Sequence, residues 1–124
     1  MALCLIVDDE EDHREIAKMF SEDAGLEVDM ARDGAEALAF CKKQMPDVVI
    51  LDWMMPVMDG IEFLYNLRNM KGGAEPHVVF CSARSSENAI NMAYAMGADV
   101  YLVKPFDPKA FEEAIKEPFD ITAR

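Results

Sequence analysis

Five short apolar runs alternate with five segments of helical periodicity, and this alternation constrains the fold more than any other feature. The runs occupy residues 3–7, 26–31, 47–53, 77–83 and 99–103. Most are almost continuously apolar, which is typical of strands buried on both faces, whereas the run at 26–31 alternates and suits a strand covered on one face. Strands joined by helical crossovers predict an α/β fold, a doubly wound (βα)5 parallel sheet of five strands.

The helical segments carry their own start and stop signals. Asp33 followed by Glu36 has the spacing of a capping box. Gly97 is suited to end the fourth helix, and Asp107 followed by Pro108 is a start signal for the last. We therefore expect helices at residues 13–25, 33–45, 61–70, 85–97 and 107–117, and a turn at 58–60. The acids at residues 10–12 are expected to start the first helix, because its N-terminal dipole favours negative charge.

Length and charge narrow the class of protein. The chain has 124 residues, so we expect one domain over residues 1–124, with a core at about 3–117 and a loose tail at 118–124. A net charge of −12 argues against direct binding to nucleic acid, which needs basic side chains. No apolar run approaches the roughly 18–20 residues that span a bilayer, and the N-terminus lacks a signal peptide.

The cysteines agree with a soluble cytoplasmic protein, which is the location that we expect. Cys4, Cys41 and Cys81 are an odd number without C-x-x-C spacing. This pattern favours reduced intracellular thiols over a disulfide framework or a zinc site.

Polar side chains follow four of the five predicted strands. Asp8 and Asp9 follow the first strand, Asp52 ends the third, Ser82 lies at the end of the fourth, and Lys104 follows the fifth. In parallel α/β sheets, ligands bind beyond the carboxyl ends of the strands. We therefore expect three carboxylates, a hydroxyl and an ammonium at one edge of the sheet.

This set of groups indicates phosphoryl transfer. Three neighbouring carboxylates raise one another's pKa unless a cation compensates them, and Mg²⁺ with oxygen ligands does so. Lys104 offers a point charge for a phosphoryl oxygen, and Ser82 offers a hydrogen bond. An aspartate can itself attack phosphorus, while the metal and the lysine offset the charge that develops during transfer.

Four stretches carry a resemblance to a known family: "LIVDDEED", "VVILDWMMPVMDGIEFL", "VVFCSA" and "GADVYLVKPF". In this order, and over about residues 3–117, they resemble the receiver domain of bacterial two-component response regulators, in particular the chemotaxis type with a single domain. The resemblance implies a flavodoxin-like sheet with strand order 2-1-3-4-5.

The resemblance also implies roles for the acids and the lysine. Asp52 would be the phosphoacceptor, and Lys104 would contact the phosphoryl group. Mg²⁺ would be held by Asp8, Asp9 and Asp52 together with the backbone carbonyl of Met54.

Further residues would form the switch that the resemblance implies. Ser82 would be the switch hydroxyl and Tyr101 the switch aromatic residue. Met54 and Arg84 would tune the rate of hydrolysis, and the Lys104–Pro105 peptide bond would be cis.

Plainer interpretations of several residues remain open from the sequence alone. Ser82 can be a simple loop hydroxyl, and Tyr101 can be a core aromatic residue. The methionines near Asp52 can line a partner surface or fill gaps in the core, and we favour gap filling. His13 lacks metal-ligand spacing, and we expect it to be exposed on the first helix.

The function implied by the resemblance is a phosphorylation-dependent switch. A histidine kinase or histidine phosphotransfer protein would phosphorylate Asp52, and a downstream target protein would bind residues 86–117. Apart from Mg²⁺-dependent self-phosphorylation and self-dephosphorylation, no enzyme activity is expected, and neither is binding to nucleic acid or membrane.

A stand-alone receiver is our leading hypothesis, and three alternatives remain. The chain can be the N-terminal receiver of a longer DNA-binding response regulator. An aspartyl-phosphate phosphatase of the haloacid-dehalogenase type needs D-x-D after the first strand, where this chain has adjacent acids at Asp8 and Asp9. A flavin-binding module is disfavoured because five acids in the first loop would repel a phosphate.

Overall fold

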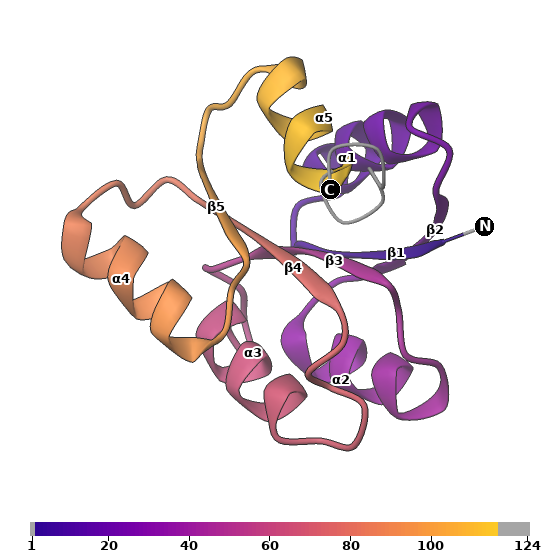
Figure 1. The fold of residues 1–124 in the computed structure, drawn as a ribbon, viewed down its shortest axis with the longest axis vertical. Coiled ribbons are helices and arrows are strands. Elements are labelled where there is room, and N and C mark those ends of the chain that lie inside the picture. Colours follow the sequence, from indigo (N-terminus) through magenta and orange to yellow (C-terminus); the bar gives the residue numbers. More distant parts are fainter. Residues whose placement is uncertain (1, 117–124) are drawn as a thin grey trace.

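Strands and helices alternate strictly along the chain in a computed structural model that describes residues 2–116 (Figure 1). The strands are β1 (Leu3–Val7), β2 (Glu27–Ala31), β3 (Val48–Asp52), β4 (His77–Ser82) and β5 (Val100–Val103). The helices are α1 (Glu11–Asp23), α2 (Gly34–Lys43), α3 (Gly60–Arg68), α4 (Glu87–Met96) and α5 (Pro108–Lys116). The predicted (βα)5 pattern is therefore confirmed.

All five strands are parallel and lie in the order β2-β1-β3-β4-β5, which confirms the predicted topology. The register aligns the strand ends. Val7 lies opposite Leu51, and Asp52 lies opposite Cys81. Since the strands run in one direction, the residues that end β1, β3, β4 and β5 come together at one edge of the sheet.

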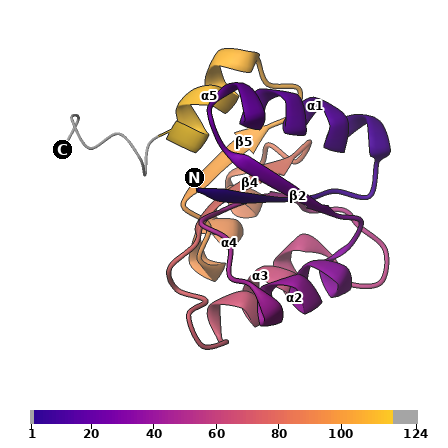
Figure 2. The ribbon, with the colours of Figure 1, turned by 90° about the vertical axis from the view of Figure 1, so that its right-hand side faces the viewer.

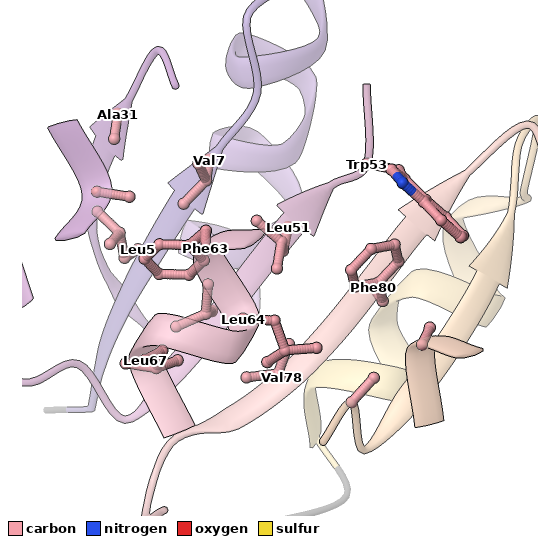
Figure 3. Packing of buried hydrophobic residues seen from close by; sticks show 14 of the residues in the cluster. Leu5, Val7, Ala31, Leu51, Trp53, Phe63, Leu64, Leu67, Val78 and Phe80 are labelled. Atoms are coloured by element: carbon pink, nitrogen blue, oxygen red, sulfur yellow. The ribbon is translucent and has the colours of Figure 1, made fainter. Parts of the chain in front are cut away.

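Helices cover both faces of this sheet (Figures 1 and 2). α1 and α5 lie on one face and contact each other, while α2, α3 and α4 lie on the other. Each face has its own core cluster. Figure 3 shows the cluster on the α2–α3–α4 side, where Phe63 and Leu64 of α3 lie against the sheet residues Leu51 and Phe80. Both faces of β3 are therefore buried, as its apolar sequence predicts.

Several predicted strands are longer than the observed ones by a residue at an end. Asp47, which the sequence predicts to begin β3, lies just before it and links to β1. Its backbone N–H donates to Leu3 O, and its carboxylate accepts from Leu3 N–H at 2.8 Å. Leu26 precedes β2, and its N–H donates to the carbonyl of Ser21 in α1. The backbone N–H groups of Asp47 and Leu26 therefore form hydrogen bonds outside the regular strand pairing. The apolar pattern of a sequence does not show where such bonds form.

The helix boundaries correct several predictions. α1 begins at Glu11, among the acids at residues 10–12 that we expect to start it, and α3 spans Gly60–Arg68 rather than residues 61–70. The Asp59 side chain caps α3 by accepting from the N–H of Glu62 at 2.9 Å. An aspartate before the first helical residue is a start signal that our prediction placed in a turn instead.

The other caps are close to expectation. Asp33 caps α2 and accepts from Glu36 N–H at 2.8 Å, but the carboxylate of Glu36 accepts from Arg32 N–H rather than closing the box on Asp33. Gly97 ends α4 with a φ of 114°, and Asp107 accepts from Ala110 N–H at the start of α5. The predicted end of the last helix at residue 117 and the predicted tail at 118–124 lie outside the described residues.

Candidate functional site

The side chains of Asp8, Asp52 and Lys104 converge at the carboxyl edge of the sheet. The ammonium nitrogen of Lys104 lies 3.1 Å from Oδ1 of Asp52 and 3.3 Å from Oδ2 of Asp8. The three side chains are only 21%, 13% and 9% exposed for Lys104, Asp52 and Asp8. One lysine therefore bridges two largely buried carboxylates that come from different strands.

Asp9 completes a cluster of three acids. Carboxylate oxygens of Asp8, Asp9 and Asp52 all lie within 4.8 Å of one another. Asp9 is exposed, so this side of the cluster faces solvent. Oxygen-only donors at such separations suit a hard divalent cation that keeps part of its water shell.

Backbone contacts fix the position of Asp8. Its N–H donates to the carbonyl of Ala31, and its own carbonyl accepts from Nη1 of Arg14 at 2.8 Å. Its Oδ1 accepts from the N–H of Glu10 at 3.0 Å, which leaves Oδ2 directed at Lys104. The loop between β1 and α1 therefore presents the carboxylate in a defined orientation.

Burial and the neighbouring acid raise the pKa of Asp52. Desolvation makes the larger contribution and the charge of Asp8 adds to it, while Lys104 opposes both. The net shift is upward, because burial and the Asp8 charge together outweigh Lys104. An additional cation beside the carboxylate would favour its charged form.

At Lys104 the neighbouring charges outweigh the effect of burial on the pKa. Burial acts to lower the pKa of its ammonium group, but the carboxylates of Asp52 and Asp8 raise it more strongly. Its net pKa is above the ordinary value, so the side chain is a fixed positive charge at neutral pH. The peptide bond between Lys104 and Pro105 is cis.

Ser82 and Tyr101 both form hydrogen bonds with the backbone of Arg84, in the loop after β4. The buried Oγ of Ser82 accepts from the N–H of Arg84 at 3.1 Å, and within residues 2–116 it makes no hydrogen bond to Asp52 or Lys104. Tyr101 is half-buried, stacks on Phe80 at 5.8 Å between ring centroids, and donates its hydroxyl to the carbonyl of Arg84 at 2.8 Å. Tyr101 is thus both a core aromatic residue and a partner of the loop after β4.

Arg84 joins these residues to the chain around Asp52. Its guanidinium lies over the ring of Trp53 at 4.5 Å from the centroid, and Nη2 lies 3.4 Å from the sulfur of Met54. The sequence singled out Arg84 and Met54 but not Trp53, whose buried indole lies under the guanidinium. Nothing in the sequence pattern distinguished Trp53 from an ordinary core residue that follows a strand.

The methionines near Asp52 divide into two groups. Met55 and Met58 are half-buried and pack against the core cluster on the α3 side, so gap filling describes them. The side chain of Met54 is exposed and contacts Arg84.

His13 is the residue near the site to which the sequence gave no role. It is exposed, as predicted, but its Nδ1 lies 2.8 Å from Oε2 of Glu10, 3.5 Å from Oδ2 of Asp8 and 3.3 Å from the ammonium of Lys104. The sequence signal for this contact is the i,i+3 spacing from Glu10 to His13, because residues so spaced at a helix are neighbours.

Within residues 2–116, no helix has the length and the apolar composition needed to cross a membrane.

Comparison with known families gives a match over nearly the whole chain. The model of the response regulator receiver domain matches residues 4–116. This range contains all of the candidate residues described above.

Individual relatives agree with the family match. The chain is 39% identical over 113 residues to response regulator Rre1 of Synechocystis, which covers 90% of this chain and 49% of Rre1. It is 34% identical to chemotaxis protein CheY of Halobacterium salinarum, covering 91% of this chain and 92% of CheY. It is 35% identical to the alkaline phosphatase synthesis transcriptional regulatory protein PhoP of Bacillus subtilis, covering 90% and 46%. The chain therefore spans about half the length of Rre1 and PhoP.

Solved structures share the fold. Chemotaxis protein CheY4 of Vibrio cholerae superposes with a TM-score of 0.88 at 36% identity, covering 94% of this chain and 98% of CheY4. The receiver domain of Francisella response regulator 1452 superposes with a TM-score of 0.89 at 30% identity, covering 98% and 99%. On its sequence, its topology and these matches, the chain belongs to the family of response regulator receiver domains of two-component systems.

Proposed function

We propose that this domain is a switch in which Asp52 accepts a phosphoryl group from a histidine kinase or a histidine phosphotransfer protein. The observation that carries the proposal is the ammonium of Lys104 held 3.1 Å from Asp52 and 3.3 Å from Asp8, beside a third carboxylate on Asp9. A carboxylate nucleophile, a fixed cation and a cluster of oxygen donors are the groups that phosphoryl transfer to aspartate needs.

Mg²⁺ is the cofactor that we propose for the acid cluster. Asp8, Asp9 and Asp52, with the backbone carbonyl of Met54, would hold it. The donor set supports this assignment because the three aspartates offer carboxylate oxygens that all lie within 4.8 Å of one another. When bound, the ion would neutralise charge on the transferring phosphoryl group.

Asp52 and Lys104 would have different roles in the transfer of the phosphoryl group. A carboxylate oxygen of Asp52 forms a bond to phosphorus while the bond from phosphorus to the histidine nitrogen of the donor breaks, and the imidazole leaves with the bonding electrons. The ammonium of Lys104 moves its contact from the carboxylates to a phosphoryl oxygen. The reactions that we propose are phosphorylation and dephosphorylation of Asp52 itself.

The new phosphoryl group would act on the loop after β4. It carries about two negative charges and strong acceptor oxygens, which would draw the hydroxyl of Ser82 away from the N–H of Arg84. Tyr101, which bonds to the carbonyl of Arg84, would turn into the space that Ser82 leaves. Phosphorylation must favour the active arrangement by several kcal/mol to produce a clean switch.

The readout surface that we propose comprises residues 86–117, of which 86–116 are described. α4 and β5 present Met92, Tyr94 and Val103 as exposed apolar side chains on this face, a composition suited to a downstream protein target. The net charge of −12 favours partners with basic patches over nucleic acid.

We propose a single domain over residues 1–124 that acts as a stand-alone receiver, located in the cytoplasm. Similarity to CheY, which this chain matches over nearly the full length of both, supports that form. The alternative is the N-terminal receiver of a longer DNA-binding regulator, and the transcriptional regulator PhoP, matched over 46% of its length, favours it.

Labelling by a small phosphodonor tests the function. Wild-type protein incubated with acetyl phosphate and Mg²⁺ should gain the mass of one phosphoryl group, and chelation of the metal should prevent the gain. Asp52→Asn should not be labelled, whereas Asp29→Asn, a control at an exposed aspartate of β2, should be labelled like wild type. Labelling of Asp52→Asn to the wild-type extent would overturn the proposal.

A further inference from the structure

An apolar cleft opens directly beside the acid cluster. Its volume is about 550 Å³, which lies within the range of roughly 300–1,000 Å³ typical of small-molecule sites. Asp8, Asp52 and Lys104 stand at its polar end.

The apolar walls come from two segments on the α1–α5 side of the sheet. Figures 1 and 2 show the position of α1 and α5 on that face. α1 contributes Ile16 and Phe20, and the segment after Lys104 contributes Phe106. Ile50 lines the floor. Because side chains two residues apart on a strand share a face, Ile50 lies on the same side of β3 as Asp52. The apolar floor therefore continues directly into the acceptor carboxylate.

The arrangement fits ligands that join an anionic group to an apolar group. A group that occupies both ends must present a phosphoryl or similar anion to Lys104 and the acid-bound cation, and an apolar portion to Ile16 and Phe106. A free phosphate leaves the apolar portion unfilled, and a purely apolar molecule leaves the charges unpaired.

We infer that the cleft binds the acyl group of a small acyl phosphate, so that the domain prefers phosphodonors with a longer apolar acyl chain. This inference rests on the proposed function. In the step itself, a carboxylate oxygen of Asp52 forms a bond to phosphorus while the bond between phosphorus and the acyl oxygen breaks. The bonding electrons leave with the acyl carboxylate, and no proton or redox partner is required.

Acetyl and butyryl phosphate provide the test because their leaving groups have nearly equal basicity and differ by two methylene groups. Burial of one methylene corresponds to roughly a fourfold change in an equilibrium or rate constant. We therefore expect the second-order rate constant for phosphorylation of Asp52 to be on the order of tenfold higher with butyryl phosphate. Equal rate constants for the two donors would overturn the inference.

α1 offers a matched pair of variants. Ile16 and Met19 are 48% and 52% exposed, but only Ile16 lines the cleft. Ile16→Asn should reduce the ratio of the butyryl to the acetyl rate constant toward one, and Met19→Asn should preserve it. An equal fall of the ratio in both variants would contradict a site in the cleft.

The outcomes separate this inference from the function on which it rests. If neither acyl phosphate labels Asp52, the proposed phosphoacceptor is wrong. If both label Asp52 at the same rate, Asp52 remains the acceptor, and only the acyl site is wrong.

Discussion

Arg84 is exposed to solvent, but both its side chain and its backbone make contacts with neighbouring residues. Its guanidinium lies over Trp53, its N–H reaches Ser82, and its carbonyl accepts from Tyr101. Arg84 therefore contacts both Trp53, the residue after Asp52, and the proposed switch residues Ser82 and Tyr101. A change at Asp52 would reach Tyr101 through this arginine if the two ends are energetically coupled.

A double-mutant cycle measures that coupling. Arg84→Ala and Trp53→Phe should show an interaction free energy of about 0.5–1 kcal/mol in urea unfolding, the usual size of an exposed cation–π contact. Since Trp53 is the only tryptophan of the chain, Arg84→Ala should also change the emission spectrum. Strictly additive unfolding free energies with an unchanged spectrum would contradict the contact.

The charge of Asp52 should reduce stability in the absence of metal. Burial and the Asp8 charge raise the pKa of Asp52, so the folded state holds this proton to a higher pH than the unfolded state does. The stability of the wild type therefore falls as pH rises from the ordinary aspartate value through the raised one.

Asp52→Asn removes this effect. At pH 7 without metal it should raise the free energy of unfolding by about 0.5–2 kcal/mol, the common gain from relieving a strained functional site. The gain should vanish at a pH below about 4, where the wild-type carboxyl is neutral. Urea titrations at both pH values check this, and a gain that is larger at acidic pH would contradict the assigned charge balance.

Among single residues, the sequence located Asp8, Asp9, Asp52 and Lys104, because residues at the carboxyl ends of parallel strands share an edge. It did not locate His13, Glu10 or Trp53 as neighbours of the site. The contacts of these residues depend on where α1 begins and on side-chain directions, which periodicity does not fix.

At the level of elements, the start of α3 is pressed against the end of β3. The N–H of Gly60 donates to the carbonyl of Trp53, and a Cβ on Gly60 would collide with the carbonyl oxygen of Asp52. α3 therefore packs its first residue on the backbone that carries the acceptor. Only glycine permits this approach without moving one of the two elements.

Gly60→Ala should lower the unfolding free energy by about 1–3 kcal/mol, the usual cost of overpacking. It should also shift the emission of Trp53, because the collision is with the backbone beside the indole. Gly25→Ala is a useful control, since a φ of 91° strains alanine there while nothing lies within 4 Å of the added Cβ. Both variants should be destabilised, but a Trp53 shift in Gly25→Ala alone would contradict the packing described.

The apolar and helical patterns of the sequence predicted the existence of each strand and helix more reliably than they predicted the first and last residues. Apolar runs predicted every strand, but the end residues depended on partners such as the Asp47–Leu3 hydrogen bonds. Asp59 was assigned to a turn although it caps α3, since the sequence "MDG" satisfies both interpretations.

For the whole molecule, the three cysteines report on global unfolding. Cys4, Cys41 and Cys81 are buried and free, and burial raises their pKa values from 9.0 to about 12, 11 and 12. Thiolate is the reactive form, so the folded protein should resist alkylation at pH 8.

Two measurements follow from these values. Iodoacetamide should modify none of the three thiols in native protein at pH 8 and all three in urea, as judged by intact mass. Stability should also decline between pH 9 and pH 12, because the unfolded thiols ionise first and the native state holds their protons longer. Rapid native alkylation of Cys4 or Cys81 would contradict their burial.

The identity of the phosphorylated residue is the central claim, and reductive trapping tests it most directly. Borohydride converts an aspartyl phosphate to homoserine, which peptide mass spectrometry locates. After treatment with acetyl phosphate and Mg²⁺, we predict homoserine at position 52 and at no other aspartate. Homoserine at Asp8 or Asp9 in place of Asp52, or at none of the three in protein that carries a phosphoryl group, would contradict the account.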